Sequence, residues 1–191
     1  MSDLEITGDS IRLREFVPSD VDPMSRYTSD PEVCRYISWG PLNREGTSKF
    51  VSSAIEASRC NPRRWYELAI VSKDTDELVG NIGLELDRGQ DRVGELGYTV
   101  RPDFWGQGIA TAASRLLLDY AFERVRLHRV WANCDEENRA SARVLEKLGL
   151  SLEGRHRDVL FVRGSWRTTL TYALLDEDRV ADTATRYPRP D

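Results

Sequence analysis

The pattern of apolar and polar positions in the first third of the chain predicts one strand followed by two helices. Residues 10–16, SIRLREF, alternate polar and apolar side chains, which is typical of a strand with one buried face. A short helical stretch follows Pro18 and ends near Pro31. Residues 45–58 then carry apolar side chains at helical spacing. The loop between these helices, CRYISWGPLN, contains Trp39.

Three strands are predicted in the middle of the chain. The runs WYELAIVS, LVGNIGLEL and VGELGYTVR are separated only by the short polar turns KDTDE and DRGQD. Consecutive strands that are joined by short turns pair side by side and antiparallel. We therefore expect an antiparallel meander here.

The second half predicts a helix, a strand, a helix and a final hairpin. Residues 108–125 place their apolar side chains on one stripe of a helix, RVWANCD reads as a strand, and NRASARVLEKLG reads as a second helix. The hairpin GRHRDVLFV–SWRTTLTYALL turns at Arg163 and Gly164. A strand on each side of the long helix predicts one parallel pair.

These elements predict an α+β fold, with one mixed, mostly antiparallel sheet of about seven strands and about four helices on its two faces. We expect residues 1–176 to form a single domain and residues 177–191 to form a loose polar tail.

Composition narrows the classes of function. The chain has 191 residues, 40% hydrophobic and 31% charged, which is neither a disordered nor a membrane-spanning composition. Its net charge of −5 disfavours nucleic-acid binding. The acidic N-terminal segment does not read as a signal peptide. Cys34, Cys60 and Cys134 lie far apart and without the histidines of a zinc site. We expect a cytoplasmic protein without a metal, nucleic-acid or membrane partner.

Two glycines stand at the start of the long helix, where a capping side chain is the usual choice. Gly106 and Gly108 in PDFWGQG leave the first backbone amides of the helix open to an anion. The alternative is a tight strand-to-helix turn that needs glycine only for its backbone conformation. Neither the dinucleotide fingerprint G-x-G-x-x-G nor the phosphate-binding G-x-x-x-x-G-K-[ST] motif is present.

Two separated motifs resemble the GNAT superfamily of acyl-CoA-dependent N-acetyltransferases. They are ELGYTVRPDFWGQGIATAA and ANCDEENRASARVLEKLGL. The chain looks closest to the RimJ/RimL branch, which includes enzymes that acetylate ribosomal-protein N-termini. The segments IRLREFVPSD, ELVGNIGL and RGSWRTTLTYALL resemble that branch too. The resemblance covers residues 8–176 and implies an enzyme that uses acetyl-CoA and no metal.

The resemblance also implies which residues bind the cosubstrate. The pyrophosphate is expected on the backbone amides of Trp105, Gly106, Gln107, Gly108, Ile109 and Ala110. Asp103 departs from the family pattern, which has Gln or Arg there, so we expect its carboxylate to turn away from the phosphate. Arg101 or Arg143 is left to supply extra positive charge.

The pantetheine arm is expected to run beside Tyr98, Thr99 and Val100 like an added strand. Asn133 and Asn138 lie across the cleft. Asn138 either binds the arm, as in the family, or caps the helix that follows it, and the two roles are compatible.

The chemistry needs a base for the amine and a proton donor for the leaving thiolate. Glu95 is the candidate base, with a pKa raised by partial burial. Many family members have a donor tyrosine where this chain has Leu145, so Ser141 on the same helix is the candidate donor, directly or through a water. The amide of Tyr98 or Val100 would polarise the thioester carbonyl.

For the acceptor, we expect the α-amine of a peptide, with Trp39 beside it. An α-amine has a reference pKa of about 8, against about 10.4 for lysine. Because we see no second carboxylate placed to help a lysine, we expect lysines to stay unmodified. A polyamine, an antibiotic or an amino acid remains an alternative acceptor, and a catalytically weak acyl-CoA-binding module remains an alternative function. A homodimer is left open.

Overall fold

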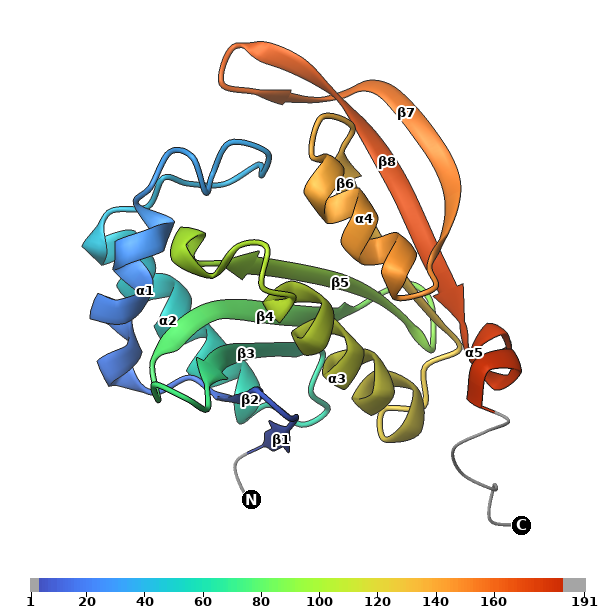
Figure 1. Ribbon diagram of the computed structural model, residues 1–191, viewed down its shortest axis with the longest axis horizontal. Coiled ribbons are helices and arrows are strands. Elements are labelled where there is room, and N and C mark those ends of the chain that lie inside the picture. The colour runs from blue at the N-terminus through green and yellow to red at the C-terminus, as the bar shows by residue number, and fades with distance from the viewer. Residues whose placement is uncertain (1–3, 184–191) are drawn as a thin grey trace.

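The computed structural model describes residues 4–183, and these form one eight-stranded sheet with helices on both sides (Figure 1). The strands are β1 (Glu5–Thr7), β2 (Ile11–Glu15), β3 (Trp65–Ser72), β4 (Leu78–Leu86), β5 (Val93–Val100), β6 (Arg129–Asp135), β7 (Ser151–Val162) and β8 (Ser165–Leu175). The α-helices are α1 (Val21–Thr28), α2 (Arg44–Ser58), α3 (Ile109–Glu123), α4 (Arg139–Lys147) and α5 (Asp176–Thr183). The predicted α+β class is confirmed.

The two elements beyond the prediction lie at the ends of the domain. Strand β1 pairs antiparallel with β2 at the edge of the sheet, with Ile6 opposite Leu13. Helix α5 begins at Asp176, and three acidic residues in its first turn suit the positive end of the helix dipole. Part of the predicted tail is therefore helical, and its remainder, residues 184–191, lies outside the described residues.

The strand order is β1-β2-β3-β4-β5-β6-β8-β7, so the predicted meander of β3, β4 and β5 is present and antiparallel. The predicted parallel pair is also present, between β5 and β6. Its pairing covers only residues 93–95 of β5, although β5 continues to Val100 and β6 to Asp135. Beyond Glu95 the two strands are no longer paired, and this gap positions the site.

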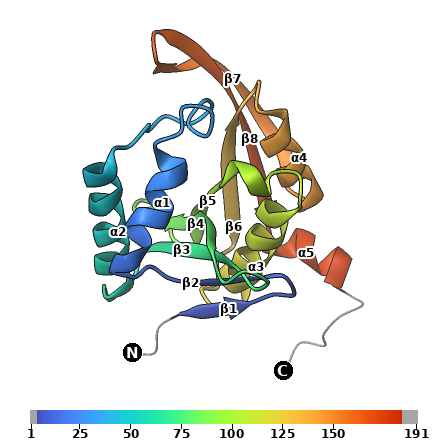
Figure 2. The same cartoon turned by 60° about the vertical axis from the view of Figure 1, so that its left-hand side comes forward.

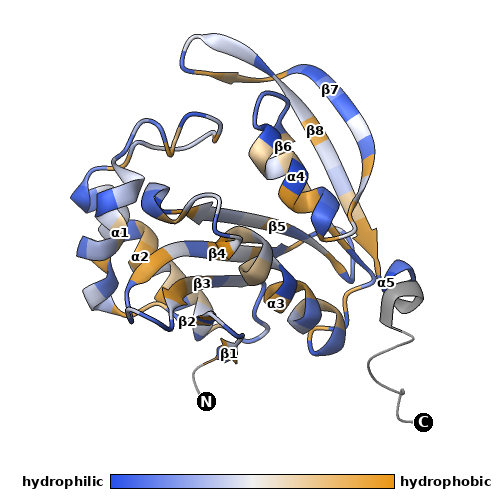
Figure 3. Ribbon diagram, viewed as in Figure 1, coloured by the Kyte–Doolittle hydropathy of each residue, from blue (hydrophilic) through white to orange (hydrophobic). Residues whose placement is uncertain are grey.

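Two apolar cores lie on opposite faces of the sheet. Helices α1 and α2 cover one face (Figure 2) and pack on Ala69 and Val71 of β3. Helices α3 and α4 cover the other face, where Leu117 and Leu145 are buried. Apolar residues concentrate in the central strands and on the inner sides of the helices (Figure 3), because the central strands are buried on both faces and each helix on one side.

The β7–β8 hairpin arches away from the sheet and returns toward the loop between α1 and α2 (Figure 1). At its tip, the guanidinium of Arg163 donates hydrogen bonds to the carbonyls of Ile37 at 3.0 Å, Trp39 at 2.9 Å and Gly40 at 2.9 Å. These bonds tie the hairpin to the loop across the open side of the sheet.

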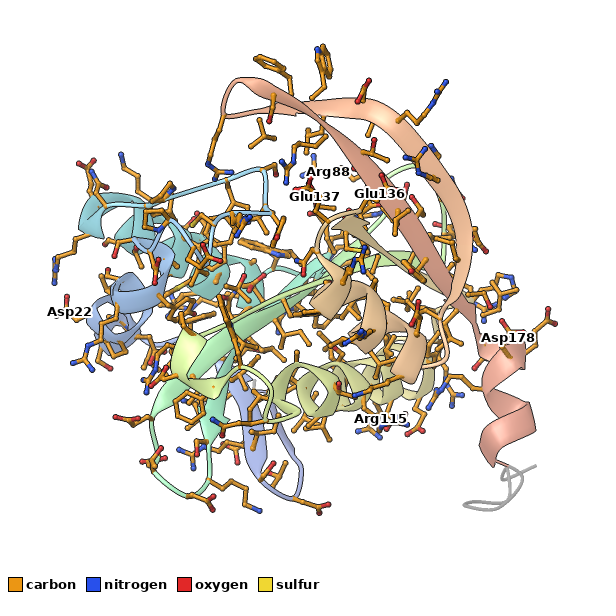
Figure 4. The ribbon with its side chains drawn as sticks, turned by 45° about the horizontal axis from the view of Figure 1, so that its top comes forward. Asp22, Arg88, Arg115, Glu136, Glu137 and Asp178 are labelled. Atoms are coloured by element: carbon orange, nitrogen blue, oxygen red, sulfur yellow. The ribbon has the colours of Figure 1, made fainter. Side chains whose placement is uncertain are left out.

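The turn between β6 and α4 is fixed to the same hairpin. Glu136 and Glu137, labelled in Figure 4, lie in this turn. Glu136 accepts a hydrogen bond from Arg155 of β7 at 2.8 Å, and Glu137 accepts one from Arg167 of β8 at 3.2 Å. Arg167 also pairs with Asp135 at the end of β6 at 2.6 Å. The start of α4 is therefore held in place by charged contacts.

Candidate active site

The divergence of β5 and β6 opens a cavity of about 870 Å³ that reaches from the start of α3 to the loop between α1 and α2. Its walls come from β3, β4, β5, β6, α3 and α4. Residues far apart in the sequence therefore share one space.

The start of α3 forms one end of this cavity. Gly106 and Gly108 both have left-handed backbones, with φ of +75° and +80°. Gly108 is the N-cap, and no side chain caps the helix. Its first amides therefore remain available to an anion, and a phosphate can approach the bare backbone closely. The geometry fits the pyrophosphate of a coenzyme A thioester.

Of the two arginines expected to supply positive charge at this end, Arg101 is already paired with carboxylates. Asp103 does turn away, because it is held by Arg101 through two contacts of 2.7 Å. Arg101 also donates to Glu77 at 3.1 Å, so this arginine is occupied by two carboxylates. Arg143 on α4 lines the cavity, so of the two arginines it remains the candidate for extra positive charge.

Most of the predicted cosubstrate residues line this one cavity. They are Tyr98, Thr99, Val100, Trp105, Gly106, Gly108, Ile109, Ala110, Asn133, Asn138 and Arg143. Gln107 does not line the cavity, and its side chain donates to the carbonyl of Asp103 at 2.8 Å. The indole of Trp105 donates to the carbonyl of Val100 at 2.7 Å, which fixes the glycine turn against the end of β5.

The two asparagines occupy different places. Asn138 is the N-cap of α4, and its side chain accepts from the amide of Ser141 at 3.1 Å, so its capping role is realised. Asn133 on β6 accepts from the hydroxyl of Thr171 at 2.8 Å. It also forms a hydrogen bond with Glu95, which couples β6 to the candidate base on β5.

Glu95 lies at the last paired position before the strands separate, and its side chain opens into the cavity. Partial burial raises the pKa of its carboxyl, and the negative charge of Glu85 raises it further. The hydrogen bond from Asn133 opposes this shift. The result is a carboxylate that is more basic than an ordinary glutamate.

On the opposite wall, Ser141 of α4 forms a hydrogen bond of 2.8 Å with the hydroxyl of Tyr98 on β5. Burial raises the pKa of Tyr98 to about 12, so the phenol stays protonated at neutral pH. Leu145, which replaces the family tyrosine, is buried in the core. Sequence reasoning placed only the backbone of Tyr98 in the site and missed this hydroxyl pair.

Trp39 lines the cavity and also a second one of about 530 Å³ beneath the β7–β8 hairpin. The two cavities share Glu95, Asn133 and the 36–39 segment of the loop. Arg163 bridges this loop to the hairpin. A slim acceptor could therefore approach Glu95 from beneath the hairpin.

The sequence shows no second carboxylate near the candidate base, but the structure brings two more glutamates to the same cavity. Glu67 on β3 and Glu85 on β4 line the same cavity as Glu95. The signal for Glu67 was its position as a lone charged residue inside the apolar run WYELAIVS. Sequence alone could not place it, because β3 and β5 are brought together only through β4.

Two classes of site are not found in the described part of the chain. Within residues 4–183, no group of three His, Cys, Asp or Glu side chains is arranged to hold a metal ion. Over the same residues, none of the helices has the length and hydrophobicity needed to span a bilayer.

The fold and the cavity together define the class of protein. The acetyltransferase (GNAT) domain family matches residues 10–151, and the chain belongs to this family. It is 30% identical to the uncharacterized N-acetyltransferase YnaD of Bacillus subtilis over 92% of this chain and 99% of that protein. The chain is an N-acetyltransferase, and acetyl-CoA is the cosubstrate used by this fold.

Solved structures of acetyltransferases have the same fold. A GNAT-family acetyltransferase from Bacillus anthracis superposes with a TM-score of 0.81 at 29% identity, covering 91% of this chain and 99% of that one. A RimL ribosomal-protein alpha-N-acetyltransferase in complex with coenzyme A has a TM-score of 0.81 at 20% identity, covering 90% and 98% of the two chains. The second likeness shows the fold alone.

If the amides at the start of α3 hold the pyrophosphate, acetyl-CoA stabilises the folded protein and Gly108→Val abolishes that effect. A ligand at about 100 times its Kd adds about 2.7 kcal/mol to the free energy of unfolding, and this increase gives a readily measured rise in Tm. Desulfo-CoA should act nearly as well, because the contacts are to the phosphates and the arm. Thermal denaturation with and without each ligand is the measurement.

The control for this variant is Gly149→Val. Gly149 has a φ of +86° and open space around its Cβ position, as Gly108 does, but it lies past the end of α4 and outside both cavities. Both variants carry similar backbone strain. Gly149→Val should keep the acetyl-CoA shift. A parent protein without any shift at millimolar acetyl-CoA contradicts the assignment of the helix terminus.

Proposed function

We propose that this enzyme transfers an acetyl group from acetyl-CoA to the α-amine of a peptide or protein N-terminus by direct attack on the thioester. The observation that carries the proposal is the gap between β5 and β6. It places an uncapped helix start, the basic carboxylate of Glu95 and the Tyr98–Ser141 hydroxyl pair on one cavity.

Each group has one role in this proposal. Arg143 and the amides of α3 bind the phosphates, and the free edge of β5 takes the arm. Glu95 accepts a proton from the amine nitrogen as the N–C bond forms. The C–S bond breaks, and the Tyr98–Ser141 pair supplies a proton to the departing sulfur.

The shape of the acceptor path supports an extended chain end. The second cavity leads under the hairpin to Glu95, and two of the residues that line it, Ile37 and Trp39, are held by hydrogen bonds from Arg163. An α-amine is substantially neutral near physiological pH, with a reference pKa of about 8, so it needs little help to lose its proton. The presence of Glu67 removes our ground for excluding lysine, and the preference for the α-amine now rests on this difference in pKa.

We expect a short peptide with a small free N-terminal residue and one internal lysine to be acetylated faster on its α-amine than on the lysine. The two amines have reference pKa values of about 8 and about 10.4, so the neutral fraction favours the α-amine. Mass spectrometry with fragmentation locates the added acetyl group. Modification mainly of the lysine overturns the α-amine proposal.

A second candidate acceptor is a small alkyl polyamine, and one observation favours it. Glu67, Glu85 and Glu95 line the same cavity, and such a grouping of carboxylates suits an acceptor with several positive charges. Fast release of coenzyme A with a triamine such as spermidine, alongside no modification of the peptide, would move the function to this class.

A further inference from the structure

We propose that Glu67 is a second proton acceptor for the acceptor amine, acting through one water in the cavity. The inference rests on the proposed acetyl transfer, but it does not depend on which primary amine is the acceptor. It gives a function to a buried carboxylate that the mechanism above does not use.

The position of Glu67 follows from the strand register. Glu67 on β3 pairs with Gly83 on β4, and Gly83 pairs with Gly97 on β5. A Cβ atom at Gly83 would lie 2.4 Å from Oε2 of Glu67, so the carboxylate lies directly above this glycine. A Cβ atom at Gly97 would meet nothing within 4 Å. Since neighbouring strands are about 4.8 Å apart, the carboxylate lies about one strand spacing from the empty space above Gly97.

Glu95 lies on the next rung of the same face, two residues before Gly97 along β5. The empty space above Gly97 is therefore bordered by two carboxylates, that of Glu67 over β4 and that of Glu95 on β5. A water beside an amine in this space is within reach of Glu67, and transfer through a single water is an accepted geometry for a general base.

A chain of hydrogen bonds holds Glu67 in this orientation. The hydroxyl of Tyr27 on α1 donates to Oδ1 of Asn81 at 3.1 Å, so the amide nitrogen of Asn81 faces Glu67 and donates to Oε1 at 2.8 Å. The side chain of Trp65 provides another hydrogen bond to this carboxylate. All three residues are buried, with exposed fractions of 0% for Tyr27 and 5% for both Asn81 and Glu67. These contacts fix the carboxylate without neutralising its charge.

The surroundings also suit a proton acceptor at neutral pH. Burial raises the pKa of Glu67 to about 7, and the charge of Glu85 on β4 adds to the rise, while the hydrogen bonds from Asn81 and Trp65 oppose it. Tyr27, behind Asn81, stays neutral because burial raises its own pKa. An acceptor with a pKa near the working pH is the most effective general base.

The proton balance gives the two carboxylates separate steps. A bound ammonium loses its first proton through the water to Glu67, and the neutral amine then attacks the thioester carbon. The nitrogen loses its second proton to Glu95 as the N–C bond forms, and the sulfur takes one proton from the hydroxyl pair as the C–S bond breaks. One carboxyl restores that donor, and the other releases its proton to solvent.

The test is Glu67→Gln, assayed by coenzyme A release with the two-amine peptide and with spermidine. Glutamine keeps one oxygen that can accept from Asn81, but it takes up no proton. We expect kcat to fall by roughly 10², the lower end of what a positioned base contributes. The acid limb of kcat near pH 7 should disappear, whereas a purely structural role would leave its pH dependence unchanged.

Two further variants sharpen the result. Glu85→Gln removes the neighbouring charge that raises the pKa of Glu67, so its acid limb should move to lower pH instead of disappearing. Gly83→Ala places a methyl group against Oε2 of Glu67, so it should displace the carboxylate and reproduce the loss in kcat. The rise in Tm with acetyl-CoA shows that each variant is folded and binds its cosubstrate.

The outcomes separate this inference from the proposed function. An active parent whose Glu67→Gln variant keeps both its kcat and its acid limb overturns the role of Glu67 and leaves the acetyl transfer standing. A parent that turns over neither the peptide nor spermidine overturns the proposed function, and the role of Glu67 with it. Loss of kcat together with the acid limb near pH 7 supports the inference.

Discussion

Replacing Glu95 with glutamine is expected to lower the maximal rate of acetyl transfer by roughly 10²–10⁴, the usual contribution of a positioned base. The side chain opens into the cavity beside the unpaired part of β5, and in the proposed mechanism it takes the proton of the attacking amine. Glutamine has the same shape but takes up no proton. The affinity for acetyl-CoA should change little, because Glu95 lies away from the start of α3. Steady-state rates and acetyl-CoA titrations of parent and variant are the measurements.

The pH dependence of this variant has a definite sign. The pKa of Glu95 is raised by burial and by Glu85, and only the deprotonated carboxylate accepts a proton. The parental rate therefore falls as the pH drops through this raised pKa, and Glu95→Gln removes that part of the acid limb. The part that belongs to Glu67 should remain.

A matched control is Glu153→Gln, which removes an exposed strand glutamate paired with Arg129 and outside both cavities. We expect it to keep the parental rate and profile. If Glu95→Gln behaves in the same way as this control, Glu95 is a surface carboxylate and not the base.

Tyr98→Phe is expected to lower kcat by roughly 10², because it removes a hydroxyl from the pair that protonates the departing sulfur. The hydroxyls of Tyr98 and Ser141 are 2.8 Å apart, and the pKa of Tyr98 near 12 keeps its proton in place at the start of the reaction. Phenylalanine keeps the ring and its packing. The acid limb of the pH profile should be unchanged, because the carboxylates remain.

The double variant decides whether the two hydroxyls act together. If the proton passes from one to the other, Ser141→Ala should cost about as much as Tyr98→Phe, and combining them should add little, as for residues that work as a unit. Single effects that multiply in the double variant indicate two independent roles. A Tyr98→Phe enzyme with near-parental kcat shows that water or another group protonates the thiolate.

The pattern of apolar positions determined the order and type of the main elements, because burial of one side gives a helix a period of 3.6, whereas burial of both faces makes the central strands short apolar runs between polar turns. The meander, the parallel pair and both central helices followed from local pattern alone. The two edge elements, β1 and α5, did not, because a strand of 3 residues and a helix of 8 residues leave little periodic signal.

The candidate site also has parts that the sequence identified and parts that only the structure showed. The glycine turn before α3 could be named from its local pattern, and Glu95 and Ser141 from the resemblance of the two motifs that contain them to the GNAT superfamily. The Tyr98–Ser141 contact, the bridge from Arg163 to the 37–40 loop, and Glu67 above Gly83 could not. Each of these joins segments from different parts of the chain. Only strand register and packing decide which side chains meet across such distances, and that information exists only in the tertiary structure.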